Sequence, residues 1–168
     1  MRNTVSCLVL LSLTSALGSG LALDNAGRKS LTGLHAVAVL VENLRPEVES
    51  AGLARATIQT DAELKLRLAG IRVLAIDRHR AEPGAPVLYI NANVSMGSDG
   101  MWGYSLHVAL VQEVQLVRNP AMIVPAETWS TDGAGAYTSS HTIPDSVRSA
   151  VKDSIDQFVN AYLEVNPK

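Results

Sequence analysis

VLYINANVSMGSDGMWGYSLHVALVQEVQLV, residues 87–117, is the stretch that decides the fold. Apolar and polar side chains alternate strictly from Leu88 to Met96, and the alternation returns, with one polar interruption, from Tyr104 to Leu116. A period of two residues is typical of a β-strand with one buried and one exposed face. The stretch therefore predicts an antiparallel hairpin whose chain reversal lies near Ser98-Asp99-Gly100.

The loop length of this hairpin follows from the apolar pattern. A two-residue Asp99-Gly100 turn would pair Ala92 with His107 and would set buried residues opposite exposed ones along the whole ladder. An odd loop shifts the register by one residue and pairs Ala92 with Leu106 instead. We expect a three-residue loop, Ser98-Asp99-Gly100, with its glycine in the left-handed conformation. A five-residue loop satisfies the same pattern.

The polar face of the hairpin carries most of the candidate binding residues. In the odd-loop register, Asn91 lies opposite His107 and Asn93 opposite Ser105. Such a band is either a solvated sheet surface or a contact surface for a ligand or partner, and the residues alone leave both interpretations open. The candidate binding residues are Tyr89, Asn91, Asn93, Ser105 and His107 on this face, and Met101 and Trp102 at the hairpin tip. Alternatively, the two tip residues cap the core.

Composition predicts one globular domain. The chain has 168 residues, of which 47% are hydrophobic and 18% charged. This is enough apolar material for a core, and it argues against disorder. Phe158 is the only phenylalanine, so we expect a mainly aliphatic core. The net charge of −2 gives no indication of the basic surface that nucleic-acid binding requires.

The N-terminus predicts a secretory signal peptide over residues 1–22. Arg2 precedes a largely apolar run that is too short to span a membrane stably. The small residues at which cleavage is expected are Gly18, Gly20 and, as the preferred site, Ala22. Cleavage would remove Cys7, the only cysteine, so the mature domain of residues 23–168 would have no disulfide and no cysteine-based chemistry. We expect a periplasmic or secreted protein without a stable membrane span, in which Asp24 to Ser30 form a flexible lead.

Two helices are predicted outside the hairpin, at about Arg55–Ala69 and Pro144–Leu163, because apolar residues recur there at helical spacing. Gly70 suits the reversal that commonly ends a helix. Thr60-Asp61-Ala62-Glu63 has the form of a capping box, which leaves open a later start for the first helix.

The remaining strands are predicted at about residues 34–44, 72–77 and 127–131, with Asn119-Pro120 and Pro125 breaking the chain before the last of them. A right-handed crossover would make the first two strands parallel. The fold class is therefore α+β, a two-layer sandwich. Its mixed, mostly antiparallel sheet of four or five strands would carry both helices on one face.

The run Gly70-Ile71-Arg72-Val73, between the helix that contains Thr60–Leu68 and the strand that begins Leu88-Tyr89-Ile90-Asn91, resembles small exported bacterial domains of unknown role. In outline, the mature chain is similar to the N-terminal domain of TolB, to the curli-secretion protein CsgG and to LptE-like envelope proteins. The resemblance implies a helix pair on a sheet and a role in assembly or interaction. It lies in the pattern alone, so no functional residue is carried over.

The sequence shows no catalytic, metal or cofactor signature. The four histidines are not spaced as metal ligands, and Ser105 and His107 have no obvious third partner for a triad. We therefore expect a non-enzymatic binding or envelope-assembly module with a protein partner, including a homodimer through the sheet face or an edge. The alternative is a small hydrolase or ligand carrier on the polar face around His107. A deep pocket that holds His107 beside a carboxylate would favour that alternative.

Overall fold

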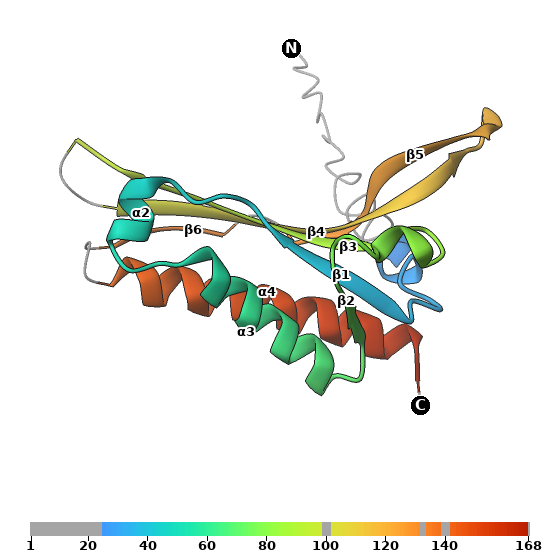
Figure 1. Cartoon of the computed structure of the whole chain (residues 1–168), viewed down its shortest axis with the longest axis horizontal. Helices are drawn as coiled ribbons and strands as arrows, with labels where there is room; N and C mark the ends of the chain where they lie inside the picture. The colour runs from blue at the N-terminus through green and yellow to red at the C-terminus, as the bar shows by residue number, and fades with distance from the viewer. Residues whose placement is uncertain (1–24, 99–101, 132–133, 139–141, 168) are drawn as a thin grey trace, which may run out of the picture.

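The structure is a computed structural model, and it describes residues 25–98, 102–131, 134–138 and 142–167. The predicted signal peptide lies outside these ranges. The elements, labelled in Figure 1, are β1 (Ala36–Val41), α2 (Pro46–Ser50), α3 (Arg55–Leu68), β2 (Arg72–Leu74), the 3₁₀ turn η1 (His79–Ala81), β3 (Val87–Met96), β4 (Trp102–Leu116), β5 (Asn119–Ser130), β6 (Ala134–Thr138) and α4 (Ile143–Val165).

The predicted α+β sandwich is confirmed. Five strands follow the order β2-β1-β3-β4-β5, with β1 parallel to both its neighbours and the other pairs antiparallel. The helices α3 and α4 lie together on one side of this sheet (Figure 1), where α3 packs on β1 and α4 on β4. A sixth strand, β6, was not predicted, and it pairs with the first residues of β4.

The register of the central hairpin is confirmed at every predicted pair. Asn91 lies opposite His107, Asn93 opposite Ser105, and Ala92 opposite Leu106. The ladder ends at Met96 and Trp102, so residues 97–101 connect the strands and the five-residue alternative holds for the ladder. Residues 99–101 lie outside the described ranges. The predicted turn conformation at Ser98-Asp99-Gly100 therefore lies outside them too. Burial of one face sets the register because a slip by one residue would expose every apolar side chain.

The first long helix starts earlier than the capping-box alternative allows. Helix α3 begins at Arg55, and Thr60 lies inside it, where its hydroxyl donates to the carbonyl oxygen of Ala56 at 2.8 Å. The later start at Thr60 is therefore wrong. At the other end, Gly70 has a φ of +87°, which fits the predicted reversal after the helix.

The core lies between the sheet and the two long helices. Alternate residues of β1, β3 and β4 point into it and are almost fully buried. Phe158 of α4, fully buried, meets Trp129 of β5 edge to face, with 5.1 Å between the ring centroids. Aromatic pairs favour this geometry, so the one phenylalanine links α4 to the far end of the sheet.

The N-terminal lead is ordered in the described part. Residues 25–29 form a short helix, and Leu31 is fully buried. The hydroxyl of Ser30 donates to the carbonyl oxygen of Thr128 in β5 at 3.1 Å. The prediction of a flexible lead is wrong for these residues because Leu31 joins the core and anchors the segment.

Strands β4 and β5 continue beyond the body as a two-stranded ribbon, which Figure 1 shows standing clear of the helices. Strand β3 pairs with β4 only as far as Val111, and from there β4 is paired along its length with β5. We call residues 112–126, which form the outer part of this ribbon, the arm. The strand β5 is therefore much longer than the predicted strand at residues 127–131.

Pro125 does not interrupt β5, contrary to the sequence prediction. It lies opposite Glu113, whose N–H donates to the carbonyl oxygen of Gly84 at 2.8 Å, away from β5. Because a strand residue directs its N–H and C=O to the same side, Glu113 and Pro125 form a non-hydrogen-bonded pair. The nitrogen of Pro125, which carries no hydrogen, therefore faces the open edge of the sheet. The ladder between β4 and β5 loses no hydrogen bond.

Candidate functional site

The sheet face opposite the helices brings together the predicted polar residues. Tyr89, Asn91 and Asn93 of β3 lie beside Ala109, His107 and Ser105 of β4. We call the five predicted polar residues on this face, Tyr89, Asn91, Asn93, Ser105 and His107, the polar band. It is at least partly exposed throughout.

Two carboxylates that the sequence did not reveal complete the polar band. The Tyr89 hydroxyl donates to Glu42 Oε2 at 2.8 Å, and His107 Nε2 lies 3.1 Å from Glu127 Oε1. Glu42 follows β1, and its N–H donates to the carbonyl oxygen of Ile90. Glu42 reaches β3 through the parallel pairing of β1, and Glu127 lies on β5, whose register with β4 shifts at two places, so sequence spacing carried no signal for these contacts.

The phenol of Tyr89 is held in its neutral form. The hydrogen bond to Glu42 raises the pKa of Tyr89, burial and the negative charge of Glu42 raise it further, and a contact with Asn91 acts in the opposite direction. Tyr89 therefore stays a hydrogen-bond donor through the physiological pH range. The band thus presents a phenol–carboxylate pair and an imidazole–carboxylate pair side by side.

The geometry around His107 does not assemble a nucleophile. Ser105 lies two residues away on the same strand face, and among the described residues no hydrogen bond joins it to His107. His107 and Glu127 both remain substantially exposed. An open strand surface leaves the pair in high dielectric, which weakens any catalytic use of it.

The predicted tip residues do not join the polar band. Trp102 is buried and belongs to the hydrophobic core, which supports the alternative that it caps the core. Its side chain is therefore no exposed anchor in the isolated chain. Met101 lies outside the described residues.

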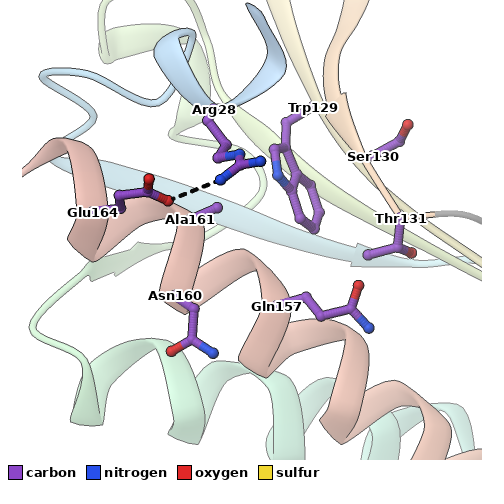
Figure 2. Close-up of a pocket in the computed structure, with 8 residues that line it drawn as sticks. All are labelled: Arg28, Trp129, Ser130, Thr131, Gln157, Asn160, Ala161 and Glu164. Carbon is purple, nitrogen blue, oxygen red and sulfur yellow. Dashed lines mark hydrogen bonds and ion pairs between the residues drawn. The ribbon is translucent and has the colours of Figure 1, made fainter. Parts of the chain in front are cut away.

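A separate cavity opens on the helix side of the sheet, where three distant segments meet (Figure 2). Its volume is about 360 Å³. The lining comes from the N-terminal helix, the end of β5 and the last turns of α4. Its residues are Arg28, Trp129, Ser130, Thr131, Gln157, Asn160, Ala161 and Glu164. A smaller cavity of about 170 Å³ lies near His35, Glu82 and Gln112. Neither of these two cavities is lined by His107.

Thr131 is the unusual member of the larger cavity. It is only 5% exposed, and its hydroxyl oxygen is buried without a hydrogen-bond partner among the described residues. The backbone N–H of the same residue is satisfied by the carbonyl oxygen of Val108 at 2.9 Å. A buried, unpaired hydroxyl costs about 1–3 kcal/mol, so native proteins rarely keep one without a use.

We predict that Thr131→Val raises the free energy of unfolding of the unliganded protein by about 1 kcal/mol, because valine has the same shape without the unpaired hydroxyl. Urea denaturation measures the change. Thr128→Val is the matched control, since the Thr128 hydroxyl accepts from Gln112 Nε2 at 2.8 Å. The control is expected to lose about 1 kcal/mol. A loss of the same size in both variants would contradict the assignment.

The arm exposes three large apolar side chains. Val117 is 99% and Ile123 57% exposed, and Met122 is also exposed. Ile123 lies opposite Gln115, and Val124 lies opposite Val114 on the other face of the ribbon. Apolar groups therefore occur on both faces of an element that has no covering layer.

Two further properties of the described part of the chain bear on its chemistry. No group of three or more His, Cys, Asp or Glu side chains there could hold a metal ion. None of its helices is both long and apolar enough to cross a membrane.

Comparison with known proteins gives no family. No protein-family model matches the chain, and a search of curated proteins finds no match. Among solved structures, the PelC dodecamer from Paraburkholderia phytofirmans is 18% identical, with a TM-score of 0.41 over 76% of this chain and 86% of that one. A minor lipoprotein from Acinetobacter baumannii is 10% identical, with a TM-score of 0.35 over 77% of this chain and 90% of that one. Nothing about the partner or activity of this chain is taken from these likenesses.

Proposed function

We propose that this protein is exported to the periplasm or secreted, and that it serves there as a non-enzymatic binding or envelope-assembly module for a protein partner. The export proposal rests on the signal-peptide pattern of residues 1–22. It requires the mature chain to lack these residues, which the mass of the purified protein tests. The binding proposal rests on the arm.

The arm has the properties of an interaction element. A two-stranded ribbon is marginally stable on its own, and this one exposes the large apolar side chains of Val117, Met122 and Ile123. Val117 and Ile123 would each gain about 1.5–3 kcal/mol from full burial against a partner. The arm projects from the body (Figure 1), so it can enter a partner's apolar groove.

The sheet edges favour contact through side chains rather than strand pairing. Edge strand β2 has only three residues. Edge strand β5 contains Pro120 and Pro125, and the second lacks the N–H that an added strand would need. A homodimer through either of these two edges is therefore disfavoured by this geometry. Self-association through the polar band remains compatible with it.

We predict that Ile123→Asp reduces recovery of the partner at least about tenfold, because an aspartate in an apolar contact must lose its hydration. Pull-down of the tagged full-length protein from its native envelope, after chemical crosslinking, measures this recovery. Leu64→Asp on α3 is the matched control, since Leu64 is 53% exposed against 57% for Ile123. Equal recovery for both variants and the unchanged protein would contradict a contact through the arm.

A further inference from the structure

The arm leaves the sheet at an irregular point of the ladder between β4 and β5. The ladder pairs Leu110 with Trp129 and Val111 with Glu127. Thr128, between these pairs, is therefore an extra residue on β5 without a partner in the ladder. Such a bulge bends the strand and increases its local twist. The direction of the arm therefore depends on what holds the bulge.

The N-terminal segment, residues 25–33, lies beside this bulge, and Figure 1 shows it in blue at the base of the arm. The Ser30 hydroxyl lies 2.7 Å from the carbonyl oxygen of Gly27 and 3.1 Å from that of Thr128, so it shares its proton between the segment and the bulge. A Cβ atom at Gly27 would lie 3.4 Å from the same Thr128 oxygen. Leu31, which is fully buried, anchors the segment in the core. The bulge is thus held by residues 98 positions away in the chain.

The Gln112 side chain joins the N-terminal segment and the bulge to the base of the arm. Its Nε2 donates to Thr128 Oγ1 at 2.8 Å and to the carbonyl oxygen of Ser30 at 3.4 Å. One amide nitrogen carries two hydrogens, so it can make both contacts at once. The Thr128 hydroxyl in turn donates to the carbonyl oxygen of Leu110 at 3.4 Å. These bonds connect both strands of the arm to the body at the point where the ladder is irregular.

The opposite edge of the same base is held by the loop before β3. The Glu113 N–H donates to the carbonyl oxygen of Gly84 at 2.8 Å. Strand β3 itself pairs with β4 only as far as Val111. Beyond Glu113 the arm extends away from the body (Figure 1), so the contacts at its base set its direction.

We propose that Ser30 and Gln112 are positioning residues that clamp the bulge at Thr128 and so fix the direction of the arm. The consequence for binding rests on the proposed function of the arm. A ribbon fixed in one direction meets its partner without first losing orientational freedom. The N-terminal segment therefore serves partner binding although no residue of it belongs to the arm.

The test is the distance between spin labels attached to cysteines introduced at Val117 of the arm and Leu64 of α3, both of which are exposed. Residues 23–168 contain no cysteine, so these two labels are unique in the mature protein. Ser30→Ala and Gln112→Ala are each expected to broaden the distance distribution and to shift its mean, because the ribbon then pivots at the bulge. Gln115→Ala is the matched control, since this glutamine lies on the same strand with an exposed side chain, and it is expected to leave the distribution unchanged. Recovery of the partner in the pull-down is expected to fall about fivefold in the two clamp variants, the factor that corresponds to one lost hydrogen bond.

A second pair of labels, at Leu64 and Leu163 on the two long helices, reports on the body and is expected to be unchanged in every variant. Three results would overturn the clamp: an unchanged arm distance in both clamp variants, the same broadening in the control, or broadening of both label pairs together. Each of them would leave binding through the arm to its own test with Ile123→Asp. A broadened arm distance with full recovery of the partner would instead support the clamp and contradict the arm as the binding element.

Discussion

Phe158→Ala is expected to lower the free energy of unfolding by about 3–5 kcal/mol. The ring is fully buried between α4 and the sheet, and its edge-to-face contact with Trp129 is lost together with its burial. The surrounding strands cannot collapse into the space because the ladder between β4 and β5 holds Trp129 in place. Chemical denaturation of the mature domain measures the difference.

The control for this variant is Leu68→Ala on the exposed surface of α3. It is expected to change stability by less than about 0.5 kcal/mol, since surface substitutions away from special features have small effects. A change below about 1.5 kcal/mol for Phe158→Ala would contradict the placement of this ring at the centre of the core.

Ile90→Ala is expected to cost about 2–5 kcal/mol, because Ile90 is fully buried on the helix side of the central strand, between Val41 and Val108. Its neighbour Asn91 faces the other side, and Asn91→Ala is expected to change stability by less than about 0.5 kcal/mol. Thermal or urea unfolding of the two variants compares adjacent residues of one strand. Similar losses for both would contradict the register of the hairpin.

That register was predictable from the sequence because two alternating stretches must both bury their apolar faces. Burial of both apolar faces requires Ala92 to lie opposite Leu106. The same register places the residues of the polar band beside one another on the other face. The helices were equally predictable from their apolar spacing. The sequence did not reveal β6. The length of β5 was missed because proline usually interrupts a strand, and Pro125 is tolerated here only because it faces the open edge of the sheet.

The contacts of the polar band were harder to predict than its residues. Glu42 reaches Tyr89 through parallel pairing of β1 with β3, and Glu127 reaches His107 across an irregular part of the ladder between β4 and β5. No tight turn joins β1 to β3, and although the two-residue turn Val117-Arg118 joins β4 to β5, the register of that pair shifts twice between the turn and His107. Sequence spacing could therefore identify a polar face but not the ion and hydrogen-bond pairs on it.

The cavity could not be predicted from the sequence either, because its lining residues come from segments that are far apart in the chain. Arg28 was assigned to a flexible lead and Thr131 to the end of the strand predicted at residues 127–131, and nothing in the sequence singled out Gln157. Only the tertiary packing of Leu31, Trp129 and Phe158 brings these segments together. Convergent polar groups from three unrelated segments leave no pattern in a single chain.

The claim that the arm is the binding element is tested most directly by photocrosslinking in the native envelope. A photoreactive amino acid at Val117, which is almost fully exposed at the end of the arm, is compared with the same group at Leu64 on α3. The account predicts a discrete adduct of defined mass from position 117 and none from position 64, with mass spectrometry identifying the attached protein. The absence of an adduct from position 117, or the same adduct from both positions, would contradict it.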